Sequence, residues 1–194
     1  MAKLYFNYST MNAGKSTLLL QAAYNYEERK MNPILFTADL DDRAGIGQIK
    51  SRIGIKRTVE TFKKNTNLFQ KIKKINNIKK IQCILIDEAQ FLSKKQVWEL
   101  SAIVDDLNIP VLCYGLRVDF RGKLFKGSEA LLALSDVIKE IKTICFCGKK
   151  ATMVVRKNDR GEVLTSGDQI FIGGNETYVS LCRKHWKISF KKKK

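Results

Sequence analysis

The chain has 194 residues, of which 44% are hydrophobic and 28% charged, the composition of a globular protein with one good core and room for a small satellite. It has neither an apolar run long enough to span a membrane nor a signal-peptide pattern, so we expect a cytoplasmic protein without a membrane partner. The net charge of +17 is common in nucleic-acid-binding proteins. However, the lysines cluster at 63–64, 71–80 and 191–194 without interleaved aromatic residues, which favours solvated basic faces over a nucleic-acid site.

The stretch from Lys3 to Thr17 predicts a phosphate-binding loop. An apolar run at 4–6 predicts a strand, small residues then close on Gly14-Lys15-Ser16, and helical periodicity follows. The first N–H groups of a helix lack intrahelical partners and carry partial positive charge, so they attract phosphate oxygens. Ser9 replaces the first glycine of the G-x-x-x-x-G-K-[ST] pattern. The predicted nucleotide-binding residues are Ser9, Thr10, Met11, Asn12, Ala13, Gly14, Lys15 and Ser16.

The first helix is predicted from Gly14 to about Lys30, where Asn32-Pro33 ends it. A short buried strand at 34–37 then leads into a polar loop at 39–45. In an open α/β sheet such a loop lies on the ligand side, so Asp41 and Arg43 could face the site. A solvent-exposed turn is an equally good interpretation of these two residues.

Residues 81–88 predict a second part of the site. The run Ile81-Gln82-Cys83-Ile84-Leu85-Ile86 is apolar without alternation, which favours a parallel strand buried on both faces. In phosphate-loop proteins an aspartate at the end of such a strand holds Mg²⁺, which we assign to Asp87 together with the Ser16 hydroxyl. Glu88 then lies beside the γ-phosphate, where a carboxylate can accept a proton from a hydroxyl or from water. The alternative is a pair of surface carboxylates after a core strand.

The middle of the chain alternates predicted helices and strands. The sequence predicts an amphipathic helix over 67–77, a helix after Ser93 through about 107, and a helix over 128–136. A strand at 111–114 leads into a charged loop at 115–122. Residues 49–61 are predicted to be irregular or strand-like. We therefore expect residues 1–142 to form an α/β domain with a parallel sheet flanked by helices. Because it contains the phosphate loop, we assign this domain to the RecA-like type.

The composition changes at Thr143, where hairpin signals and cysteines begin. The chain has five cysteines and no secretion signal, which argues against a disulfide framework. Four residues form a paired-thiol and C-x-x-H pattern that predicts a closed, tetrahedral, structural Zn²⁺ site: Cys145, Cys147, Cys182 and His185. Buried cysteines with an incidental surface histidine are the alternative. We expect a zinc-binding domain over 143–190 and a disordered basic tail at 191–194.

Seven ordered motifs together resemble the bacterial thymidine kinases of the type II class over essentially the whole chain. The resemblance also covers the spacing within the C-x-C and C-x-x-H pairs. The motifs are residues 9–16, Asp41-Asp42-Arg43, Asp87-Glu88-Ala89-Gln90-Phe91, residues 114–122, Cys145-Phe146-Cys147-Gly148, residues 172–178 and Cys182-Arg183-Lys184-His185.

The resemblance implies a nucleoside kinase of nucleotide salvage. The γ-phosphoryl group of ATP, bound with Mg²⁺, passes to the 5′-hydroxyl of thymidine or deoxyuridine, giving ADP and the nucleoside monophosphate. Glu88 matches the family's general base, and Arg43 helps neutralise charge in the transition state. Asp87 and Gln90 match ATP-site positions. The family is typically cytoplasmic, homotetrameric and inhibited by dTTP.

The resemblance also implies a pocket for the nucleoside. Phe91, Leu116 and Phe120 match positions that enclose the thymine ring. A lasso-like loop over residues 168–178 covers the nucleoside and binds the base largely through backbone groups. The lasso residues assigned to substrate binding are Phe171, Ile172, Gly173 and Tyr178.

Two other functions share parts of these motifs. A zinc-containing phosphate-loop ATPase acting on nucleic acid would use Glu88 to activate water, and the charge of +17 favours it. The chain is short, however, and contains no second set of helicase-like motifs. A nucleotide-binding regulatory module without turnover is the third possibility, and the Asp87-Glu88 pair argues against it.

Overall fold

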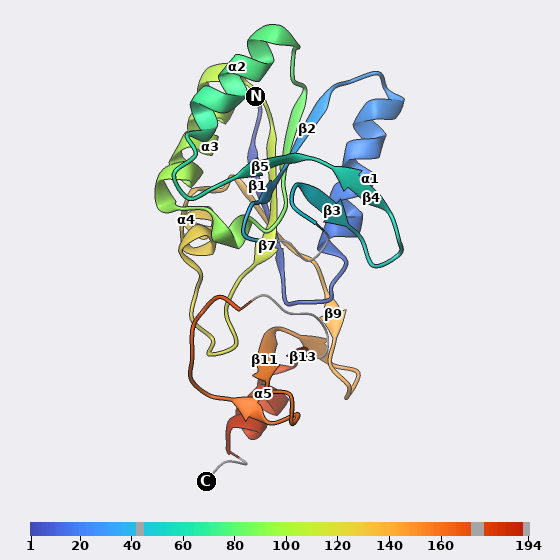
Figure 1. The fold of residues 1–194 in the computed structure, drawn as a ribbon, viewed down its shortest axis with the longest axis vertical. Coiled ribbons are helices and arrows are strands. Elements are labelled where there is room, and N and C mark those ends of the chain that lie inside the picture. The colour runs from blue at the N-terminus through green and yellow to red at the C-terminus, as the bar shows by residue number, and fades with distance from the viewer. Residues whose placement is uncertain (42–44, 172–176, 192–194) are drawn as a thin grey trace.

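The computed structural model describes residues 1–41, 45–171 and 177–191, and its main element is a six-stranded sheet (Figure 1). The strand order is β5-β2-β6-β7-β1-β8, and each neighbouring pair is parallel. The apolar run predicted as a doubly buried strand is β6, whose four residues are all buried. The strands are β1 (Leu4–Ser9), β2 (Pro33–Ala38), β5 (Glu60–Phe62), β6 (Cys83–Ile86), β7 (Val111–Leu116) and β8 (Val137–Glu140).

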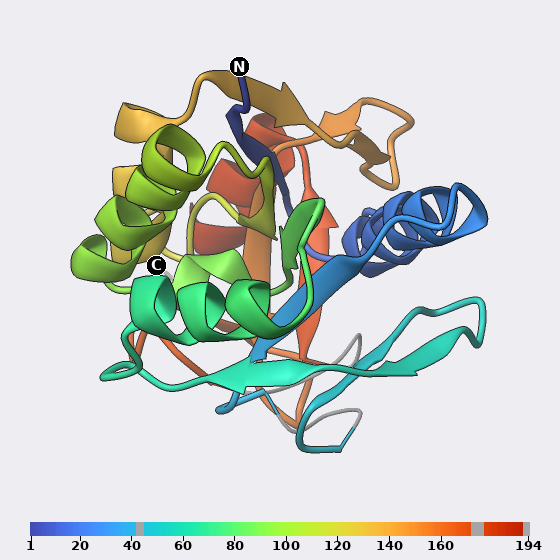
Figure 2. The ribbon, with the colours of Figure 1, turned by 90° about the horizontal axis from the view of Figure 1, so that it is seen from above.

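Helices cover both faces of this sheet, as predicted (Figure 2). Helix α1 (Lys15–Glu28) packs on one face through Leu19 and Leu20. The opposite face carries α2 (Leu68–Ile78), α3 (Lys94–Leu107) and α4 (Lys126–Leu134). The parallel α/β fold expected for the first two thirds of the chain is therefore confirmed.

Local side-chain chemistry sets the ends of the helices. The Asn67 side chain accepts a hydrogen bond from the Gln70 N–H at the start of α2. Ser93 and Gln96 form a reciprocal capping box at the start of α3. Helix α3 ends at Asn108, which adopts the left-handed conformation with φ of 51°. These caps explain why both helices begin where the sequence predicts.

The stretch expected to be irregular or strand-like holds three short strands. Strands β3 (Gln48–Lys50) and β4 (Lys56–Thr58) form an antiparallel hairpin, and β5 joins the edge of the main sheet. Arg57 of β4 donates a hydrogen bond from Nη1 to Glu27 Oε2 of α1 at 3.0 Å. Through this contact the hairpin packs beside the helix that follows the phosphate loop.

The C-terminal residues form small antiparallel sheets and one helix at the carboxyl end of the main sheet (Figure 1). Their own apolar cluster is small and includes Cys145, Val155 and Leu181. The elements are β9 (Thr143–Ile144), β10 (Lys150–Ala151), β11 (Met153–Lys157), β12 (Val163–Leu164), β13 (Tyr178–Leu181) and α5 (Arg183–Lys191).

Strand β8 and helix α5 are among the elements that the sequence analysis did not predict. Strand β8 adds to the edge of the sheet beside β1. Helix α5 includes Lys191, the first residue of the tail expected to be disordered, and the rest of that tail lies outside the described residues. Among the described residues, no helix combines the length and apolar character needed to cross a membrane.

Candidate functional site

One cavity of about 310 Å³ opens where the strands of the main sheet end, and it extends toward the C-terminal sheets. Most of the residues predicted for nucleotide and substrate binding line it: Met11, Asn12, Ala13, Gly14, Lys15, Ser16, Asp87, Glu88, Gln90, Phe91, Leu116, Phe120, Phe171 and Tyr178. Asp41 also lines it, which favours a place in the site over an outward-facing turn. The cavity therefore joins the phosphate-loop end and the aromatic end of the predicted site.

The phosphate loop connects β1 to α1 and uses left-handed backbone at two positions. Gly14 caps α1 with φ of 80°, and Asn12 has φ of 66°. Lys15 is largely buried, and its Nζ lies 3.2 Å from Ser9 Oγ and 3.1 Å from the Thr10 carbonyl oxygen. Ser9 and Thr10 thus contact the amine of the loop lysine, although neither of them lines the cavity.

Ser16 and Asp87 come together from the start of α1 and the end of β6. The Ser16 hydroxyl donates a 2.8 Å hydrogen bond to Asp87 Oδ2. The pKa of Asp87 is raised to about 7, mainly by burial and to a smaller extent by the neighbouring Glu88 carboxylate. Hard oxygen donors side by side at a phosphate loop fit the ligand preference of Mg²⁺.

Glu88 occupies a strained backbone position next to Asp87. Its φ of 51° places it in the left-handed region, which a non-glycine residue adopts at a cost of about 1 kcal/mol or more. Gln90 holds the side chain, because its Nε2 donates to Glu88 Oε2 at 2.5 Å while its Oε1 accepts from the Leu116 N–H at 2.9 Å. The buried amide of Gln90 therefore joins the carboxylate to the end of β7.

Two glycines hold the short 3₁₀ turn η1 (Ala89–Phe91) that follows Glu88. A Cβ at Gly127 in α4 would lie 2.7 Å from the carbonyl oxygens of Ala89 and Leu92. A Cβ at Gly115 in β7 would lie 2.9 Å from Gln90 Oε1. Because real Cβ atoms do not approach this closely, neither position has room for a side chain: the backbone of the turn lies against Gly127, and the Gln90 side chain lies against Gly115.

We expect Gly127→Ala to destabilise the protein by about 1–3 kcal/mol through overpacking and to lower turnover by displacing Glu88. The sign is diagnostic, because glycine to alanine at a position whose backbone alanine can adopt otherwise stabilises by about 0.4–1 kcal/mol. Urea denaturation and kcat measure the two effects. Glu129→Ala, at an exposed position of the same helix, is the control. A more stable Gly127→Ala variant with full activity would contradict the contact.

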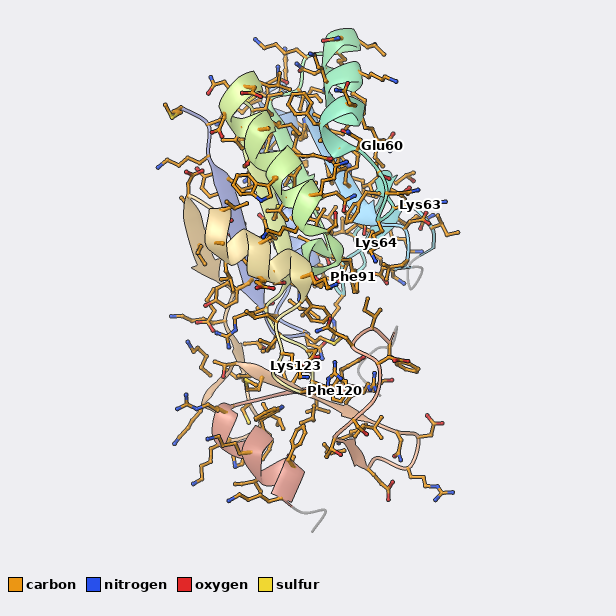
Figure 3. All side chains as sticks on the ribbon, turned by 90° about the vertical axis from the view of Figure 1, so that its left-hand side faces the viewer. Glu60, Lys63, Lys64, Phe91, Phe120 and Lys123 are labelled. Carbon is orange, nitrogen blue, oxygen red and sulfur yellow. The ribbon has the colours of Figure 1, made fainter. Side chains whose placement is uncertain are left out.

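Aromatic side chains form the other end of the cavity. Phe91 and Phe120 lie near the junction of the main sheet with the C-terminal sheets, as Figure 3 shows. Phe120 is 1% exposed and packs in a cluster with Met11, Val154 and Tyr178. The Tyr178 hydroxyl donates to the Phe171 carbonyl oxygen at 2.8 Å. A flat ring bound here would contact apolar side chains both from the loops of the main sheet and from the C-terminal sheets.

Polar residues to which the sequence analysis assigned no role also contact this end of the cavity. The Arg156 guanidinium carbon lies 4.2 Å from the ring centroid of Phe120 and 5.4 Å from that of Phe171. Its Nη1 donates to the Asp168 carbonyl oxygen at 2.9 Å. Asp119 accepts from the Gln169 amide at 3.2 Å. These contacts connect β11 and the loop after β7 to the segment predicted as a lasso. Arg156 lies in none of the seven motifs, so no local pattern marks it.

The four predicted metal ligands also meet. Their ligand atoms all lie within 4.8 Å of one another. Cys145 Sγ and Cys182 Sγ are each 3.4 Å from His185 Nδ1, and Cys147 Sγ is 3.9 Å from Cys182 Sγ. Tetrahedral zinc with ordinary bond lengths requires about 3.5 Å between sulfur and nitrogen and about 3.8 Å between sulfurs, so the cluster fits the ion.

The electrostatics of Cys145 agree with a metal-binding thiolate. Burial raises its pKa, but hydrogen bonds from the backbone of Cys147 and Cys182 and from His185 outweigh that effect and bring it to about 6. The thiolate, not the thiol, is the form that binds a metal.

Three predicted site residues lie outside the described part of the chain: Arg43, within 42–44, and Ile172 and Gly173, within 172–176.

Comparison with known proteins identifies the family. The family model described as thymidine kinase matches residues 2–186. A thymidine kinase of Vibrio vulnificus is 57% identical over 187 residues, which cover 96% of this chain and 97% of the relative. A thymidine kinase of Mannheimia succiniciproducens is 60% identical over 187 residues, 96% of each chain. One of Agrobacterium fabrum is 57% identical over 190 residues, 98% of each chain. The cavity, the phosphate loop and these matches agree: the chain belongs to the thymidine kinase family.

Proposed function

We propose that this thymidine kinase transfers the γ-phosphoryl group of Mg-ATP to the 5′-hydroxyl of thymidine or deoxyuridine, with Glu88 as general base. The observation that carries the proposal is that Glu88 lines the same cavity as the phosphate loop and the aromatic end. In that position its carboxylate can accept the hydroxyl proton while the phosphoryl group departs from ADP.

The phosphate end is assigned to the loop and its neighbours. The N–H groups of residues 9–16 and the Lys15 amine bind the phosphates, and Gln90 belongs to the same site through its contact with Glu88. Ser16 and Asp87 would hold Mg²⁺, which when bound neutralises charge on the transferred group. Arg43 is proposed to add positive charge in the transition state.

The nucleoside end is assigned to Phe91, Leu116 and Phe120, with Phe171, Ile172, Gly173 and Tyr178 from the lasso over 168–178. Support comes from the apolar cluster that includes Phe120 and Tyr178 and from the contacts of Arg156 with both parts of the chain. A closed cover would keep water away from the phosphoryl group, so that transfer to the sugar exceeds hydrolysis.

The C-terminal cluster is proposed to hold structural Zn²⁺, because four protein ligands leave no position open for a reacting molecule. We also propose that the boundary between the two domains lies at 142/143.

Four further proposals rest on the family alone: the protein is a homotetramer, dTTP inhibits it by feedback, it acts in nucleotide salvage, and it is located in the cytoplasm.

ADP release from Mg-ATP tests the function with three separate additions: buffer, thymidine or single-stranded DNA. We expect ADP only with thymidine, in a one-to-one ratio with thymidine monophosphate. DNA-stimulated ADP release that does not respond to thymidine would overturn the proposal. That result would favour an ATPase in which Glu88 activates water.

A further inference from the structure

The side chain of Ser180 in β13 contacts the phosphate loop, although the two lie at opposite ends of the chain. Its hydroxyl donates a 2.6 Å hydrogen bond to the carbonyl oxygen of Met11. Ser180 is two residues before the cluster cysteine Cys182, and its strand pairs with β11 opposite Val154. The hydroxyl is therefore held by a sheet that continues into the Cys/His cluster.

The orientation of the Met11 carbonyl sets the direction of a phosphate-facing donor. In a trans peptide the C=O of one residue and the N–H of the next point in opposite directions, and the described residues contain no cis peptide. Binding the Met11 oxygen on the side of β13 therefore turns the Asn12 N–H away from β13. Both residues line the cavity at its phosphate end.

The same peptide needs support because Asn12 has φ of 66°. A non-glycine residue in this region costs about 1 kcal/mol or more unless its surroundings impose it. The Thr10 hydroxyl also reaches the Met11 oxygen, at a longer 3.3 Å. The Met11 side chain belongs to an apolar cluster with Val154 and Tyr178 of the C-terminal sheets, so that part of the chain contacts both the carbonyl oxygen and the side chain of Met11.

We propose that Ser180 is a positioning residue for ATP: it fixes the Met11–Asn12 peptide so that the phosphate loop is shaped before the nucleotide arrives. This inference rests on the proposed function only in taking the loop as the ATP site. It implies that the C-terminal part of the chain contributes to both substrate sites. Ser180 of β13 acts on the phosphate loop, and Trp186 of α5, whose Nε1 donates to the Phe120 carbonyl oxygen at 2.9 Å, acts near the nucleoside.

Three variants test the assignment. Ser180→Ala removes the hydroxyl, and Ser180→Thr keeps it on a residue suited to a strand. Ser189→Ala is the matched control, because it removes a hydroxyl that also donates to a carbonyl oxygen, that of His185, but within α5. Dissociation constants for Mg-ATP and for thymidine, each measured alone by calorimetry, and zinc content are compared with the wild type.

We expect Ser180→Ala to weaken Mg-ATP binding about five- to tenfold, the effect of one lost hydrogen bond. Thymidine binding and zinc content should stay within twofold of wild type, and Ser180→Thr and Ser189→Ala should bind Mg-ATP normally. Unchanged ATP affinity in Ser180→Ala would overturn the inference. An equal loss of thymidine affinity or zinc would also overturn it, because it would show a general structural role. Failure of the proposed function would appear separately, as wild-type protein that makes no thymidine monophosphate.

Discussion

Glu88→Gln is expected to lower kcat by about 10²- to 10⁴-fold, the usual contribution of a general base. The amide keeps an oxygen that can accept from Gln90 but cannot take a proton from the nucleoside hydroxyl. Mg-ATP and thymidine affinities should change little, because the base acts in the transition state and not in the ground state. Single-turnover formation of thymidine monophosphate and separate binding titrations measure the two effects.

Glu129→Gln is the matched control, since it makes the same change at an exposed position of α4 and should leave kcat unaltered. A Glu88→Gln variant with near-normal kcat would show that the proton goes elsewhere. A variant that has lost ATP binding altogether would instead assign Glu88 to the architecture of the phosphate site.

Loss of zinc is the second change with a large expected effect. Metal analysis should find about one zinc per chain, and Cys182→Ala should abolish it. Structural zinc contributes roughly 10–16 kcal/mol in small zinc modules, and the apolar cluster around Cys145 is small, so the C-terminal sheets should lose their fold. Thymidine binding should disappear, and limited proteolysis should cleave within residues 143–191.

Cys83→Ala tests whether the effect belongs to the cluster. Cys83 is buried on β6 in the core beneath α1, far along the chain from the four ligands. This variant should retain about one zinc and thymidine-dependent turnover. Fully active, folded wild-type protein without metal would eliminate the zinc proposal, whatever the behaviour of the variants.

The parts of the site that the sequence predicts are those with local physical causes. The phosphate loop depends on one strand, one turn and one helix start, so Gly14, Lys15 and Ser16 are recognisable within a few residues. The same holds for Asp87 and Glu88, which end a strand whose apolar run is unmistakable. Parallel strands place such ends at one edge of a sheet, and the structure confirms that both segments line one cavity.

Contacts between distant segments could not be predicted in this way. In the sequence, nothing distinguishes Arg156 from any other charged residue of a short strand, and only the fold places it against Phe120. Ser180 carries no motif, and its partner precedes it by 169 residues. Strand β8 is half exposed at a sheet edge, so it lacks the continuous apolar run that reveals β6. Helix α5 has no buried residue and is rich in lysine, so it resembles a solvated tail.

The hydrogen bond between Ser180 and Met11 has a consequence for synthesis on the ribosome. The phosphate loop emerges among the first residues of the nascent chain, but its partner emerges 169 residues later. Contacts this distant along a chain are slow to form, because the entropy of closing the loop must be overcome first. A growing chain would therefore carry an incomplete ATP site until β13 has left the exit tunnel. Full nucleotide affinity would then be a late event of folding, reached only after β13 has been synthesised and has paired with β11.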